Sequence, residues 1–144
     1  MPLSPRRTVI QLSIAAALLA GSATAQPAAP PAAAIDWSSA KMVEVDLTNF
    51  AFSPASLALQ PGVPYRLHFV NKSSGGHDFT AKDFFEEATV DPAGQALLKN
   101  GKISLKGSEV ADVGVVANRV GHYDVVCSHL MHATMGMRGQ IVVE

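Results

Sequence analysis

Short stretches in which apolar and polar residues alternate run through most of the chain. In the first of them, Val43, Val45 and Leu47 alternate with acidic and hydroxyl side chains. Alternation with a period of two residues predicts a β-strand with one buried face and one exposed face. Similar patterns predict further strands at residues 57–59, 65–70, 102–106, 109–116, 123–127 and 138–144. Short strands separated by turn residues are typical of a β-sandwich or a barrel.

The connections between these strands are rich in turn-forming residues. Residues 49–54 interrupt the alternation, and residues 71–76 form a polar, glycine-rich loop. The turn at Gly107-Ser108 is expected to join residues 102–106 and 109–116 into an antiparallel pair.

Two segments depart from the strand pattern. One or two turns of helix are predicted at residues 91–100, because Asp91 can cap the first turn, Pro92 fits inside it and Gly101 can end it. Phe84-Phe85, followed by Glu86-Glu87, predicts a helical or turn segment that covers a sheet edge.

The N-terminus has the composition of an export signal. Arg6 and Arg7 precede an apolar run at residues 9–20, and a small-x-small cleavage pattern ends at Ala25. We therefore expect residues 1–25 to be a signal peptide that directs the chain to a bacterial periplasm. The paired arginines fit a twin-arginine signal and an ordinary secretory signal equally well. The apolar run is shorter than a membrane span, so none is expected.

Residues 26–39 begin with a run of Pro and Ala, which predicts an extended linker. Residues 40–144 then remain as one folded domain.

Composition excludes several classes of protein. A single cysteine among 144 residues excludes an internal disulfide framework, a Cys₄ zinc site and an Fe–S cluster held by one chain. The formal net charge of −1 gives no sign of nucleic-acid binding. The chain contains no His-x-His pair, which a multicopper oxidase or a nitrite reductase would need, and nothing marks an oxyanion hole. We expect a monomer that is not an enzyme and has no catalytic residue.

Soft metal ligands gather after the predicted strand at residues 123–127. One hairpin can present the Cys127 thiolate, the His132 imidazole and the Met137 thioether to one point, and His77 is the candidate for a fourth ligand. Two imidazoles, a thiolate and a weak axial thioether form the ligand field of a blue-copper electron-transfer site. Each residue also has a structural interpretation: Cys127 as an inert buried thiol, His77 as a hydrogen-bonding loop residue and Met137 as core packing.

The sequence resembles the cupredoxins, small type 1 copper proteins of the plastocyanin, azurin and pseudoazurin superfamily. The resemblance covers roughly residues 42–144 and rests on three motifs: Tyr123-Asp-Val-Val-Cys127, the Cys-x₄-His-x₄-Met spacing from Cys127, and His77-Asp-Phe-Thr. It implies an all-β, Greek-key β-sandwich with at most a short helix. It also implies one Cu(I)/Cu(II) ion in a type 1 site, with His77, Cys127, His132 and Met137 as ligands.

Two positions depart from the pattern of many relatives. Leu130-Met131 stands where they have Pro or Pro-Gly, and Asp78 stands where they have an Asn that ties the two ligand loops together. A carboxylate at Asp78 is expected to favour Cu(II) and lower the reduction potential.

Two functions follow from the resemblance. The first is a periplasmic carrier that passes single electrons through His132 to a redox partner such as a cytochrome or a copper enzyme. The alternative is a periplasmic copper-binding protein for tolerance or delivery, in which Cys127, His129, His132 and the methionines capture and release the metal. His129 would then either displace a ligand or form, with Met131, a transient entry point for copper. A solvent-facing His129 with no metal role is the simpler interpretation, and Met131 and Met135 are expected as an apolar rim or packing. His68 and His122 are expected at the surface.

Overall fold

The computed structural model describes residues 34–144. The predicted signal peptide and residues 26–33 of the predicted linker lie outside this part of the chain. Within it, the elements in order are η1 (Trp37–Ser39), β1 (Lys41–Thr48), β2 (Ala51–Ser53), β3 (Ser56–Leu59), β4 (Pro64–Asn71), β5 (His77–Thr80), α1 (Lys82–Glu87), β6 (Thr89–Val90), α2 (Pro92–Leu97), β7 (Lys102–Leu105), β8 (Val110–Val116), β9 (Gly121–Val126) and β10 (Arg138–Val143).

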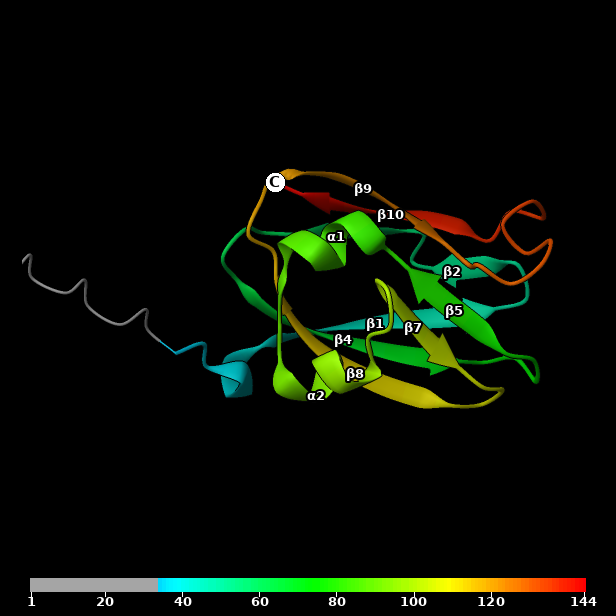
Figure 1. Cartoon of the computed structure of the whole chain (residues 1–144), viewed down its shortest axis with the longest axis horizontal. Coiled ribbons are helices and arrows are strands. Elements are labelled where there is room, and N and C mark those ends of the chain that lie inside the picture. The colour runs from blue at the N-terminus through cyan, green and yellow to red at the C-terminus, as the bar shows by residue number, and fades with distance from the viewer. Residues whose placement is uncertain (1–33) are drawn as a thin grey trace, which may run out of the picture. The chain divides into compact units, whose positions relative to one another are not determined.

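The strands form two five-stranded sheets that face each other (Figure 1). The first sheet has the order β2-β1-β4-β8-β6, and the second has the order β3-β10-β9-β5-β7. Strands β1 and β4 pair in parallel, as do β3 and β10, and the other pairs are antiparallel. The predicted all-β sandwich is confirmed, with two short helices in place of the one that was expected.

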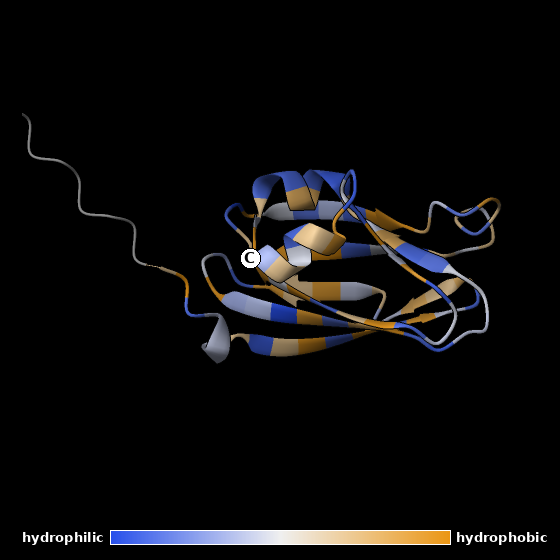
Figure 2. Cartoon of the chain, turned by 60° about the horizontal axis from the view of Figure 1, so that its bottom comes forward, coloured by the Kyte–Doolittle hydropathy of each residue, from blue (hydrophilic) through white to orange (hydrophobic). Residues whose placement is uncertain are grey.

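The core lies between the two sheets and is built from the alternating apolar positions. Figure 2 shows hydrophobic and hydrophilic residues alternating along the strands. In β4, Tyr65, Leu67 and Phe69 are buried, and the residues between them are only partly covered. Burial of one such side chain contributes about 1.5–3 kcal/mol. The alternation therefore fixes which face of each strand points inward.

The predicted pairing of residues 102–106 with 109–116 is wrong. Strand β7 pairs with β5 in the second sheet, and β8 pairs with β4 and β6 in the first. The turn at Gly107-Ser108 thus carries the chain from one sheet to the other. Both strands bury apolar residues in the same core. The alternating pattern is therefore compatible with pairing to each other or to other strands, and it does not identify the hydrogen-bonded neighbour.

Two smaller strands were not predicted separately. The interruption at residues 49–54 contains β2, which pairs with the end of β1 through Asp46, Leu47 and Thr48. The two-residue strand β6 pairs with the end of β8. Both are too short for an alternating pattern to be recognised.

Both helices lie where the sequence predicted a helical segment or a helical or turn segment. The Asp91 carboxylate accepts a hydrogen bond of 2.8 Å from the Gly94 amide and thereby caps α2. The same oxygen accepts a bond of 3.0 Å from the Gly114 amide on β8, which fixes the helix against the sheet. In α1, Phe84 and Phe85 are buried. Neither helix, nor any other in residues 34–144, is long and apolar enough to cross a membrane.

Candidate metal centre

Four predicted ligands come from one end of the sandwich. His77 is the first residue of β5, Cys127 follows β9, His132 lies in the connection to β10, and Met137 directly precedes β10 (Figure 1). One ligand atom from each of His77, Cys127 and His132 lies within 4.8 Å of the others, and Cys127 Sγ is 3.5 Å from His132 Nδ1. The structure therefore brings a thiol and two imidazoles to one point, as the spacing predicted.

His77 is a buried imidazole with nothing to bond to. Its side chain is only 2% exposed, and neither ring nitrogen has a hydrogen-bond partner among the described residues. Burial, followed by the neighbouring His132 and His129, lowers its pKa and so favours the neutral ring with a free lone pair. A buried polar group without a partner costs free energy, which a bound metal ion would offset.

Cys127 is equally shielded, with 1% exposure. Burial raises the pKa of its thiol, so the group remains protonated until a cation displaces the proton. A thiol, two imidazoles and a nearby thioether suit copper in both oxidation states. The donor set therefore fits a single copper ion.

Met137 closes the hairpin that carries Cys127 and His132. It is fully buried, its carbonyl oxygen accepts a 3.2 Å hydrogen bond from the Cys127 amide, and its amide donates a 3.0 Å bond to the His132 carbonyl oxygen. The Met137 backbone is thus hydrogen-bonded to both Cys127 and His132, the other two proposed ligands of this loop. Met131 and Met135 are 59% and 56% exposed, which favours a rim over core packing.

Asp78 connects the two ligand segments. Its buried carboxylate accepts 2.6 Å hydrogen bonds from the amide and the hydroxyl of Ser128, the residue after Cys127. Thr80 Oγ1 donates a 3.0 Å bond to the same carboxylate, and Lys102 Nζ lies 3.8 Å from Oδ2. Asp78 therefore occupies the place that the resemblance gives to a tying Asn, with a charged group in place of an amide.

Asn71 holds the glycine-rich loop in front of His77. Its side-chain amide donates 2.8 Å bonds to the carbonyl oxygens of Gly75 and Lys106, and its oxygen accepts bonds from the amide and hydroxyl of Ser73. The sequence marked this position only as the start of a loop. The available signal in the sequence was an Asn at the start of a Gly-rich segment, and its burial was not predicted.

Phe50 was also missed. Its ring meets His132 edge-on, with centroids 5.3 Å apart and an interplanar angle of 88°. Phe50 has a φ of 64°, which is uncommon for a bulky residue, and nothing in the local pattern predicts it.

His129 lies on the outer side of the centre. Its ring stacks on His132 at 5.3 Å with an interplanar angle of 19°, and its side chain is 43% exposed. Its Nε2 is 3.7 Å from Asp78 Oδ2. The residue is thus adjacent to the centre, but it is not one of the three whose ligand atoms converge.

Comparison with known proteins identifies the family. A family model described as a cupredoxin-like domain matches residues 11–143. The chain belongs to the cupredoxin-like family. A search of curated proteins finds no match.

Solved structures show the same cupredoxin fold at low sequence identity. Reduced auracyanin from Roseiflexus castenholzii is 17% identical with a TM-score of 0.55, and the match covers 73% of this chain and 98% of that one. Auracyanin B is 22% identical with a TM-score of 0.53, over 73% and 89% of the two chains. A multi-copper oxidase from Pediococcus acidilactici is 16% identical with a TM-score of 0.59, over 81% of this chain and 29% of that one. At these identities the likeness concerns the fold.

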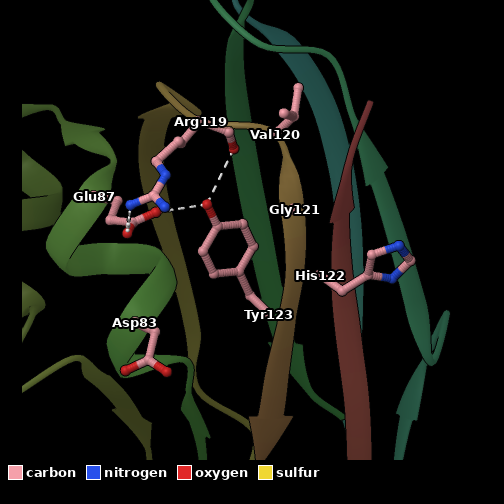
Figure 3. Close-up of a pocket in the computed structure, with 7 residues that line it drawn as sticks. All are labelled: Asp83, Glu87, Arg119, Val120, Gly121, His122 and Tyr123. Carbon is pink, nitrogen blue, oxygen red and sulfur yellow. Dashed lines mark hydrogen bonds and ion pairs between the residues drawn. The ribbon is translucent and has the colours of Figure 1, made fainter.

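The other end of β9 in this cupredoxin carries a recess of about 310 Å³ (Figure 3). The Tyr123 hydroxyl donates to Glu87 Oε2 at 2.7 Å and to the Arg119 carbonyl oxygen at 3.0 Å. Arg119 Nη1 lies 2.7 Å from Glu87 Oε1. His122 is exposed, as expected, and points away from Tyr123 across the strand. These contacts join α1 to β9 far from the ligand residues.

Proposed function

We propose that this protein is a type 1 copper protein that transfers single electrons, with His77, Cys127, His132 and Met137 as the copper ligands. The observation that carries the proposal is the buried His77 ring, whose two nitrogens have no partner in residues 34–144, next to the Cys127 thiol and the His132 imidazole. A copper ion held there would alternate between Cu(I) and Cu(II).

The surroundings of the ligands suit electron transfer. His77, Cys127 and Met137 lie within the packed end of the sandwich, and Asp78 and Asn71 fix the two segments that carry them. Ligands held this firmly move little when the charge of the site changes. Little reorganisation favours rapid electron exchange.

His132 is the point at which electrons would leave. It is less buried than the other ligands, and Phe50 packs against its edge. On the same loop, Leu130, Met131 and Met135 are 89%, 59% and 56% exposed. An exposed apolar surface around a partly exposed ligand suits brief docking of a redox protein such as a cytochrome or a copper enzyme. We infer a location in the periplasm, on the basis of the signal pattern in residues 1–25.

Copper tolerance or delivery is the second candidate function. It is favoured by the exposed imidazole of His129, which a pure electron carrier does not need, and by the exposed thioethers of Met131 and Met135, which are also soft copper ligands. These donors could capture and release the metal at the surface.

The first experiment is to add Cu(II) to the purified mature protein and record its visible and paramagnetic-resonance spectra. A strong thiolate-to-copper band is expected, and Cys127→Ser should abolish it. Met137→Leu should change the resonance spectrum, whereas Met135→Leu, the matched control on the exposed side of the loop, should not. Persistence of the band in Cys127→Ser would refute the proposed site.

A second experiment separates the two candidate functions. An electron carrier should show a reversible reduction potential and rapid electron exchange with a cytochrome, and it should retain copper against a modest chelator. Loss of copper to that chelator, together with slow electron exchange, would favour the tolerance or delivery function.

A further inference from the structure

Three of the four proposed copper ligands are shielded from solvent. His77, Cys127 and Met137 are 2%, 1% and 0% exposed, so an ion in solution cannot meet them first. His132 is partly covered by Phe50 and by His129. The more exposed of the two imidazoles on this loop is therefore the ring of His129.

We propose that His129 captures copper from solution and passes it to His132, from which it moves to the buried ligands. This inference rests on the proposed function, because it assigns a loading step to the same centre. His129 is then a temporary ligand and not part of the final site.

The geometry places His129 one step from His132. The two rings are stacked 5.3 Å apart with an interplanar angle of 19°, and the His129 ring centroid lies 6.4 Å from that of His77. The His132 amide donates a 3.1 Å bond to the His129 carbonyl oxygen, so one backbone turn holds both rings. A short movement of an exposed side chain would bring its ligand atom to an ion shared with His132.

The space around His129 is provided by Gly76. A Cβ at that position would lie 3.3 Å from His129 Cε1 and 3.6 Å from the Leu105 carbonyl oxygen. Glycine thus leaves room for the ring on this side of the centre. It also allows the chain before His77 to pass close beneath His129.

The charge near His129 assists capture. Its Nε2 lies 3.7 Å from Oδ2 of the buried Asp78, a negative group that attracts a cation. Lys102 Nζ lies 3.8 Å from the same oxygen and offsets part of this attraction. Imidazole is a good ligand for Cu(II), and exposed rings exchange metal readily.

The transfer is a ligand exchange without a change of oxidation state. The bond from Cu(II) to the His129 nitrogen breaks as bonds to His132 and His77 form. When the bond to Cys127 forms, its thiol proton is released to solvent. No oxidant or reductant is required.

Stopped-flow mixing of the metal-free protein with excess Cu(II) tests the route, with growth of the visible band as the signal. The wild-type rate should saturate with copper concentration, because the capture complex fills before the band appears. His129→Gln should reach the same final absorbance about tenfold more slowly at low copper.

His122→Gln, an exposed histidine at the far end of β9, is the matched control and should load at the wild-type rate. Loading of His129→Gln at the wild-type rate would overturn the proposal. If the reduction potential of that variant also differed from the wild-type value, His129 would instead be an electrostatic partner of Asp78.

The capture step is also tested without the visible band. Cys127→Ser should bind Cu(II) with a nitrogen-type resonance spectrum, and adding His129→Gln should slow the appearance of this spectrum about tenfold at low copper. Equal binding rates in the single and double variants would overturn the capture step. If the wild type forms no thiolate band at any copper concentration, the proposed function fails, and this comparison of binding rates still decides the role of His129.

Discussion

Ser128 donates two hydrogen bonds to the Asp78 carboxylate, one from its amide and one from its hydroxyl, and both are 2.6 Å long. Ser128 follows Cys127, and Asp78 follows His77, so this contact sets the separation of two proposed ligands. The carboxylate is buried and carries a negative charge only partly balanced by Lys102. The same residue therefore positions the centre and contributes to its electrostatics.

Asp78→Asn should raise the reduction potential of the copper-loaded protein. An amide oxygen can still accept a bond from Ser128, so the loops remain joined while the negative charge that favours Cu(II) is removed. The loss of a partly balanced charge corresponds to roughly 1–2 kcal/mol, or about 40–90 mV for one electron. Cyclic voltammetry measures the change. Asp124→Asn, an exposed carboxylate on β9, the strand that precedes Cys127, is the control. An unchanged or lower potential in Asp78→Asn would contradict the argument.

His77→Leu should stabilise the metal-free protein while it removes stabilisation by copper. The buried ring has no hydrogen-bond partner in the described residues, and replacing it with an apolar side chain removes that cost, by roughly 1–2 kcal/mol. Copper stabilises the wild type because it binds the folded state. Urea unfolding with and without Cu(II) checks both effects. Exposed His122→Leu should stay close to wild type, and equal stabilisation by copper in His77→Leu would show that His77 is not a ligand.

Asn71→Ala should destabilise the fold by roughly 1–2 kcal/mol, because it removes a buried side chain that bonds to the partly buried carbonyl groups of Gly75 and Lys106. The loop before His77 should then hold copper less firmly. Urea unfolding and copper retention against a chelator measure the two effects. Asn118→Ala, whose exposed side chain donates to Glu87 and Thr89, is the matched control and should cost less. An equal cost for both variants would show that Asn71 has no special role.

The strands and their buried faces followed from the sequence, because alternation reports which side of a strand is inward. Val45, Leu47, Leu67 and Phe69 are all fully buried as the pattern predicted. Alternation does not report which strand is the neighbour, and for this reason the partners of β7 and β8 were wrong. The crossing at Gly107 depends on contact with the Ser74 backbone, more than thirty residues earlier in the chain.

The candidate site was predictable where ligand type and spacing agree. Cys127 and His132 are five residues apart, and the structure brings both to His77. Their binding of copper stays a prediction. The residues that support the ligands were harder to predict. Asn71 bonds to the carbonyl oxygen of Lys106, thirty-five residues later in the chain, and the position of the Phe50 ring depends on a positive φ. Tertiary contacts of this kind leave no periodic signal in the sequence.

Tyr123→Phe should lower stability at neutral pH and make its decline at alkaline pH shallower. Burial, and then the hydrogen bond to the Glu87 carboxylate, raise the pKa of Tyr123 above its ordinary value of 10.0. The unfolded chain therefore loses this proton first, and the free energy of unfolding falls as the pH rises from about 10 towards the folded-state pKa. The variant lacks this proton and loses bonds to Glu87 and Arg119, at a cost of about 1–2 kcal/mol.

Urea unfolding of the metal-free protein between neutral and alkaline pH measures both parts of the Tyr123→Phe prediction. Tyr65→Phe, which removes a bond from the Gln60 amide, is the control for loss of a hydroxyl at neutral pH. The visible band of the copper-loaded protein should be the same in Tyr123→Phe and wild type, because the residue lies at the end of β9 away from Cys127. If the stability of Tyr123→Phe fell with alkaline pH as steeply as that of the wild type, a group other than this buried phenol would control stability above pH 10.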